Sequence, residues 1–208
     1  MKLKLNVLKI IGVFSFLLLS VCSLSYASPA GWSVGIFEGA PLLTTDEGIE
    51  WLSPTATKGI SFNSITTILS DENSSLYGFR LADNTQIASL FNAYGVAIAT
   101  SSANFVPVQT FLNDFGFTGQ ATGYRFVQGI SKTIGTEADR VFTPLVFESF
   151  STSKGYAALT ESQNTLDFSH IEIGSWLLRD ATPVPVPSSI WLFIPGFLGL
   201  IGFKKRIC

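Results

Sequence analysis

The central part of this chain lacks cysteine and has a single histidine. Its two cysteines, Cys22 and Cys208, lie near the ends, and the histidine is His170. A disulfide framework and a zinc site made of histidine and cysteine are therefore excluded there. A nucleophile activated by histidine would have to be serine or threonine, and no Gly-x-Ser-x-Gly elbow occurs. Because Phe168 and Ile171 flank His170 in an alternating pattern, we predict a strand histidine with a structural role.

Sequence motifs for nucleotide binding, glycoside hydrolysis and metal binding are also missing or weak. The glycines are scattered and form neither a phosphate-binding loop nor a dinucleotide fingerprint. Nothing in the spacing of the acidic residues selects a glycosidase pair. The run Asp71-Glu72-Asn73 offers oxygen ligands for Ca²⁺, but three adjacent polar residues are more typical of a solvated turn. We expect no catalytic residue, no metal site and no cofactor.

Positive charge is scarce between the two ends. Six of the 13 basic residues belong to segments 1–27 and 182–208, whereas all 15 acidic residues lie between them. Seven basic residues remain, and they leave the region between the ends with a net charge of −8. Nucleic acid requires clustered cations, so an acidic, lysine-poor surface argues against nucleic acid as a partner.

The N-terminus has the features of a secretory signal peptide. Three lysines precede an apolar run over residues 10–21, and Ser25 and Ala27 supply the small side chains that signal peptidase requires. We predict cleavage after Ala27, which gives a signal peptide of residues 1–27. Cys22 raises the alternative of a lipoprotein, but the residue before it is a bulky valine.

The C-terminus combines a proline-rich spacer over residues 181–189 with an apolar and basic tail over residues 190–208. The apolar run from Ile190 to Phe203 carries no charge. It ends at three consecutive cations, Lys204, Lys205 and Arg206. This order predicts a transmembrane helix whose basic end stays cytoplasmic. Fourteen residues with three glycines are few against the roughly 20 that a stable span needs, which favours temporary anchoring over a permanent anchor. A buried C-terminal helix is the disfavoured alternative, since such helices seldom end in consecutive cations.

The spacer contains a Val-Pro-x-Pro motif made of Val184, Pro185, Val186 and Pro187. Together with the short apolar run and the basic stop, this motif resembles the PEP-CTERM sorting signal in a variant form, because the commonest form has glutamate at the position of Val186. The resemblance implies processing by an exosortase-type enzyme. It also implies export, tethering in the inner membrane, and a final place in the cell envelope or extracellular matrix.

Residues 28–180 predict one secreted domain of the α+β class, an antiparallel sheet with two or three short helices. Helices are expected after the caps Ser61 and Asp83 and from Pro107, each with apolar residues at helical spacing. The remaining segments predict strands near the start of the domain and after its third helix, over 28–43, 46–52, 122–130, 140–151, 155–160 and 165–178. The segment 46–52 begins with a turn at Asp46 and Glu47. A β-sandwich with helical insertions is the alternative.

Five short segments of this domain carry a second resemblance. They are residues 48–52, 57–62, 77–82, 86–91 and 173–179. They are similar to a recurring secreted PEP-CTERM domain and to bacterial C-type-lectin-like domains. The resemblance implies an early tryptophan strand paired with the final strand, two helices, and a glycan as partner. From their chemistry, we expect Trp51 and Trp176 to share a core, and Arg80 to pair with a carboxylate such as Glu50.

These observations favour an exported, non-enzymatic protein with a structural, adhesive or glycan-binding role, located at the cell surface or in the exopolysaccharide. The partners expected are the processing enzyme, the membrane and a glycan. Two alternatives remain, a surface polysaccharide hydrolase and a permanently anchored membrane protein facing the periplasm.

Overall fold

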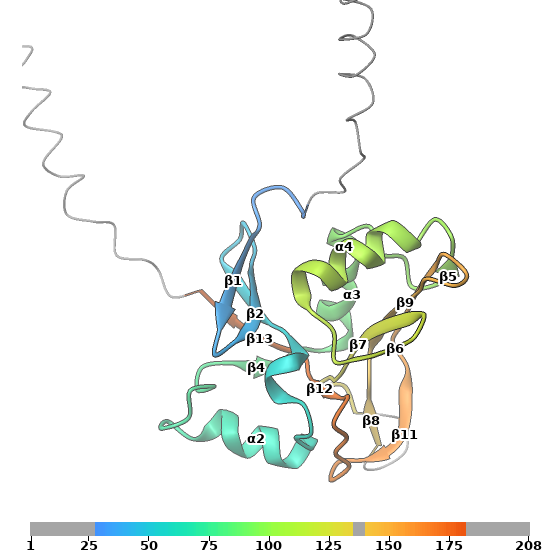
Figure 1. Cartoon of the computed structure of the whole chain (residues 1–208). Coiled ribbons are helices and arrows are strands. Elements are labelled where there is room, and N and C mark those ends of the chain that lie inside the picture. Colours follow the sequence, from blue (N-terminus) through green and yellow to red (C-terminus); the bar gives the residue numbers. More distant parts are fainter. Residues whose placement is uncertain (1–27, 135–139, 182–208) are drawn as a thin grey trace, which may run out of the picture.

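The computed structural model describes residues 28–134 and 140–181 (Figure 1). The strands are β1 (Ser33–Phe37), β2 (Ala40–Thr44), β3 (Ile49–Leu52), β4 (Arg80–Leu81), β5 (Thr100–Ser101), β6 (Gly119–Ala121), β7 (Tyr124–Ile130), β8 (Arg140–Phe142), β9 (Leu145–Ser149), β10 (Lys154–Ala158), β11 (Glu161–Thr165), β12 (Gly174–Ser175) and β13 (Leu177–Asp180). The helices are η1, a 3₁₀ turn (Pro54–Thr57), α2 (Phe62–Ser70), α3 (Asn84–Ala93) and α4 (Phe105–Phe115). Among these residues, no helix reaches the length and hydropathy that a membrane crossing requires.

Two sheets organise the domain. Sheet A has the strand order β1-β2-β3-β13-β4, and sheet B has the order β12-β7-β9-β10-β5 with β6 added beside β7. All pairings are antiparallel except β12 with β7. Helix α4 contacts β2 of sheet A and β9 and β10 of sheet B, so it lies between the sheets (Figure 1). The α+β class with mostly antiparallel strands is confirmed.

Local signals placed the helices well. The Ser61 side chain accepts from the Ser64 N–H at the start of α2. At the start of α3, Asp83 and Gln86 form a reciprocal capping box, which satisfies two N–H groups that the helix itself leaves free. The predicted start of α4 was wrong by two residues, because Pro107 is the third residue of the helix. A proline is tolerated throughout that first turn, where N–H groups have no partner within the helix.

A cluster of aromatic side chains fills the space between the sheets. Trp176 is fully buried, stacks on Phe115 at 5.5 Å between ring centroids, and meets Phe91 edge-on at 5.6 Å. Its indole N–H donates to the Pro144 carbonyl at 3.2 Å. Trp51 belongs to the same cluster, so the expected shared core of the two tryptophans is confirmed.

The predicted strand over residues 165–178 was wrong. The chain forms β11 up to Thr165, turns through a loop, and then enters the short strands β12 and β13. The Gly59 N–H, shared between the carbonyls of His170 and Ile173, holds this loop. His170 therefore lies exposed on a loop and not in a strand. Its ring stacks on Phe168 at 6.3 Å, and its Nδ1 accepts from the Glu172 N–H at 3.2 Å.

The suggested pairing of Arg80 with Glu50 was also wrong. Arg179 lies directly opposite Glu50 in the β3–β13 register, and their side chains pair at 2.6 Å. The Arg179 guanidinium also lies 4.2 Å from the centre of the Phe79 ring. Arg80 faces the exposed Asp180 at 4.0 Å. Because Glu50 and Arg179 are 129 residues apart in the chain, local sequence analysis cannot identify this pair.

A buried ion pair crosses sheet B beneath α4. Glu148 on β9 is fully buried and accepts from Nε of its register partner Arg125 on β7. The guanidinium also donates to the Asn113 side chain at 2.7 Å and lies over the rings of Phe117 and Phe150. Burial lowers the pKa of Arg125. Arg125 is the hydrogen-bond partner of this carboxylate, whose Oε2 atom makes no hydrogen bond to any residue that the structure describes.

Candidate functional site

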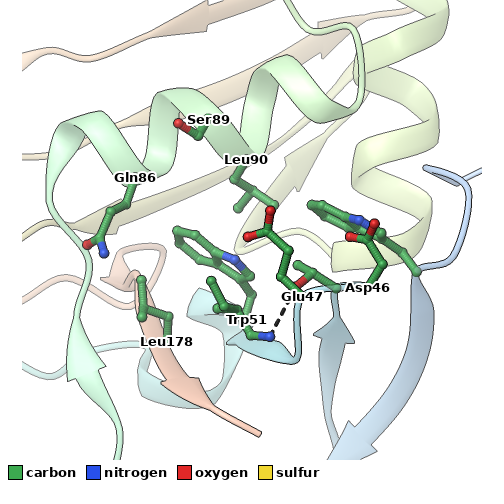
Figure 2. Close-up of a pocket in the computed structure, with 10 residues that line it drawn as sticks. Asp46, Glu47, Trp51, Gln86, Ser89, Leu90 and Leu178 are labelled. Carbon is green, nitrogen blue, oxygen red and sulfur yellow. Dashed lines mark hydrogen bonds between the residues drawn. The ribbon is translucent and has the colours of Figure 1, made fainter.

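A pocket of about 280 Å³ opens between sheet A and helix α3 (Figure 2). Trp51 on β3 and Leu178 on β13 are register partners, so their side chains lie on the same face of the sheet and form the floor. Helix α3 contributes Gln86, Ser89 and Leu90 to the opposite wall. The pocket thus depends on strands from both ends of the domain and on the helix that covers them.

The turn between β2 and β3 forms one rim of the pocket. The Thr45 N–H donates to the Ile49 carbonyl at 2.9 Å, which closes a three-residue turn with Gly48 at φ +77° in its last position. The Thr45 hydroxyl accepts from the Ile49 N–H at 3.0 Å, the dashed line in Figure 2. The Ala181 N–H donates to the Gly48 carbonyl at 2.6 Å. The turn is therefore fixed both from within and by the end of β13.

This turn carries two carboxylates, Asp46 and Glu47, to the pocket. Figure 2 shows the Glu47 carboxylate above the floor, between Trp51 and helix α3. Both acidic residues are exposed, and neither has a recorded hydrogen bond or ion pair within the described part of the chain. The pocket lining includes no lysine or arginine. The site is therefore acidic above an apolar floor.

Trp32 completes the lining and is held by the first residues of the domain. Its ring meets Tyr94 edge-on at 5.7 Å, and the Tyr94 hydroxyl donates to Asp114 at 3.1 Å. The Ser28 hydroxyl donates to the same carboxylate at 2.5 Å. Burial, aided by the adjacent Asp114 carboxylate, raises the pKa of Tyr94 far above its ordinary value, so this hydroxyl remains a donor at neutral pH.

This arrangement suits the binding of a polyhydroxylated ring. The indole of the half-buried Trp32 and the exposed edge of Trp51, which is 5% exposed, offer apolar surface to C–H groups. The carboxylates, the amide of Gln86 and the hydroxyl of Ser89 offer hydrogen bonds to hydroxyl groups. The lining can therefore contact a sugar ring both through apolar surface and through hydrogen bonds.

The residues of the predicted sorting signal are not among those that the structure describes. The sorting motif Val184, Pro185, Val186 and Pro187, the basic stop Lys204, Lys205 and Arg206, and the cleavage residue Ala27 all lie outside the described residues. Of the predicted spacer (181–189) and tail (190–208), the structure describes residue 181 alone.

The other sequence candidates lie elsewhere in the domain. Asp71 accepts from the backbone N–H and the side-chain amide of Asn73 at 2.9 and 3.2 Å, the pattern of a polar turn. No group of three or more metal-ligating His, Cys, Asp or Glu side chains occurs within residues 28–134 and 140–181. His170 is not part of the pocket lining.

Sequence analysis missed the residues that make the pocket. Asp46 and Glu47 were recognised only as part of a turn, and Trp32 only as part of a strand region. One local signal was present, a pair of carboxylates in a tight turn directly before the tryptophan strand. That α3 would cover this strand is a long-range property with no local signal.

Comparisons of this chain with protein-family models, with curated proteins and with solved structures found no match.

Proposed function

We propose that this protein is an exported, non-enzymatic component of the cell envelope or exopolysaccharide that binds a glycan in the pocket of Figure 2. The observation that carries the proposal is the pairing of tryptophan surface with two carboxylates that have no recorded partner, Asp46 and Glu47. Such carboxylates form strong hydrogen bonds to hydroxyl groups, and the apolar floor excludes water from one side of them.

The charge and size of the pocket restrict the class of sugar that can bind there. A cavity of about 280 Å³ accommodates one sugar unit, either terminal or along a chain. Two carboxylates without a nearby cation disfavour uronic acids and other anionic sugars, because like charges at an interface oppose binding. A neutral or amino sugar is the unit that fits.

The strand topology supports a C-type-lectin-like arrangement as the finer fold assignment. The tryptophan strand β3 pairs with the final strand β13, as the resemblance implies, and α2 and α3 follow β3 in the chain.

The terminal segments support export and sorting. In this proposal, signal peptidase removes residues 1–27, the apolar tail holds the protein in the inner membrane, and an exosortase-type enzyme cleaves at the Val184–Pro187 motif. The domain is then released to the envelope or the matrix. The membrane contact is temporary because the apolar run is short.

The Asp46→Asn/Glu47→Gln double variant is expected to bind its glycan at least about tenfold more weakly, because a charged hydrogen bond contributes about 1.5–3 kcal/mol. Binding of the exported protein to immobilised neutral, amino and acidic polysaccharides measures this loss. Glu72→Gln is the matched control, since Glu72 is exposed and does not line the pocket.

Equal binding by the double variant and the wild type would exclude this pocket as the site. Release of reducing sugar from any of these polysaccharides, abolished by a single Asp or Glu substitution, would favour a hydrolase and contradict the non-enzymatic assignment.

The processing step has a separate test. Intact mass measurement of the mature protein is expected to give a chain that begins at Ser28 and has lost the tail after the Val184–Pro187 motif. Substituting Pro185 and Pro187 with alanine is expected to leave the protein in the inner membrane with Cys208 intact. A wild-type protein that retains Cys208 in that membrane would instead indicate a permanent anchor.

A further inference from the structure

The outer edge of sheet A is a free strand. β1 is the terminal strand of the sheet and pairs only with β2 within the residues described. The other terminal strands of the two large sheets, β4, β5 and β12, have two residues each, whereas β1 has five. Figure 1 shows β1 at the outside of the sheet. Within sheets A and B, β1 is therefore the longest edge available to pair with another strand.

The hairpin turn determines which groups of β1 point outward. Phe37 and Ala40 close a two-residue turn in which Glu38 and Gly39 both have positive φ, at 49° and 84°. In such a hairpin the closing pair exchanges hydrogen bonds, and the bonding alternates along the strand. The backbone groups of Val34 and Ile36 therefore point away from β2. No partner is recorded for them.

The side chains of the same two residues are apolar and unusually exposed. Val34 is 48% exposed and Ile36 is 71% exposed. The strand itself has no charged residue and no proline, the features by which proteins usually prevent edge pairing. In a domain with a net charge of −8, this neutral strand lets an identical strand approach without direct charge repulsion.

We propose that two copies of this chain associate by antiparallel pairing of their β1 strands about a two-fold axis at Gly35. The register is self-complementary, because Val34 then lies opposite the partner's Ile36 and the two glycines face each other on the axis. Both outward-facing residues of each strand exchange hydrogen bonds with the other copy. Because the same edge is used by both copies, the pairing closes a dimer and does not propagate a fibre.

The pairing surface is centred on Gly35, opposite Leu42 on β2, whereas the pocket is built around the β2–β3 turn and helix α3. Trp32, the residue before β1, belongs to the pocket lining, so the two surfaces are neighbours on sheet A. Two five-residue strands form a small interface, so the dimer is weak and concentration-dependent. It carries two pockets, and binding to a repetitive polysaccharide then gains from the high effective concentration of the second pocket.

A cysteine at the axis tests the register. Gly35 has an ordinary φ, and a Cβ at this position would lie 3.8 Å from its nearest neighbour, the Leu42 carbonyl, so a side chain fits. In a non-hydrogen-bonded antiparallel pair the Cα atoms are about 4.5 Å apart, within the range that a disulfide spans. In a full-length Cys22→Ser/Cys208→Ser background, Gly35→Cys is expected to give a covalent dimer on mild oxidation. Ile171→Cys, at an equally exposed loop position, is expected to stay monomeric.

Two further variants test the edge itself by sedimentation at several protein concentrations. Val34→Pro removes an N–H that only the second copy uses, and Ile36→Lys places a charge in the pairing surface. Each is expected to weaken the dimer at least about tenfold, with an unchanged circular dichroism spectrum, whereas Ile171→Lys leaves it unchanged. A wild-type chain that is monomeric at all concentrations, or Gly35→Cys that crosslinks no faster than Ile171→Cys, would overturn the proposal. So would a dimer that survives Ile36→Lys.

Discussion

Gly174→Ala is expected to prevent stable folding. A Cβ at this position would lie 1.8 Å from the Pro54 carbonyl oxygen and 2.6 Å from its carbon. Both are backbone atoms of η1, which packs directly against β12, so no side-chain rotation relieves the overlap. Separating the two segments also breaks the bond from the Ser175 N–H to the Thr57 hydroxyl, which measures 2.7 Å. We expect the free energy of unfolding to fall by more than about 4 kcal/mol, a size that is typical of a disrupted core.

Thermal unfolding followed by circular dichroism, together with the yield of folded protein, measures this effect. Gly35→Ala is the matched control, because a Cβ there meets only ordinary contacts and the backbone conformation is unstrained. That variant is expected to change stability by less than about 1 kcal/mol. A Gly174→Ala protein that melts within a few degrees of the wild type would mean that β12 and η1 do not pack as described.

Arg125→Met is expected to destabilise the domain by about 3–5 kcal/mol, because it leaves the buried Glu148 carboxylate without a compensating charge. The loss does not come from the removed contacts alone, since methionine retains much of the apolar packing between Phe117 and Phe150. Arg125→Lys is expected to lose less, because it keeps the positive charge and gives up the planar donor geometry.

A double-mutant cycle separates the buried charge from the packing. In Arg125→Met/Glu148→Met both charges are absent, and the double variant is expected to be more stable than Arg125→Met alone. Chemical denaturation of the four proteins gives the coupling free energy. Additive losses would show that Arg125 does not neutralise Glu148.

Sequence analysis succeeded where the determining interactions are local. The Asp83 cap depends on a side chain and a backbone N–H only three residues apart, so it can be recognised without knowledge of the fold. The Ser61 cap is of the same kind. The early tryptophan strand paired with the last strand was anticipated only through a family resemblance, since no local pattern specifies partners so far apart.

The errors share a physical cause. Glu50 and Arg179 were not matched because the register of β13 against β3 decides which side chains meet. The loop at His170 contains the apolar residues Phe168 and Ile171, which suggested a strand, but its backbone bonds to Gly59 instead of joining a sheet. The pocket required the same information, since Trp51, Leu178 and Glu47 come together only when sheet A and α3 assemble. The sequence shows which side chains are acidic, aromatic or apolar, but it does not show which of them come together in the folded domain.

The position of β13 inside sheet A has a mechanical consequence. The strand forms ladders with β3 on one side and β4 on the other, and the chain leaves it toward the segment that carries the proposed membrane tail. A force on that tail pulls along the strand and loads the bonds on both sides together. The strand is also the last of the sheet to be synthesised, so β3 and β4, which it joins, are connected in the sheet only after it has been made. Assembly is then completed by the same strand through which the tether would pull on the domain.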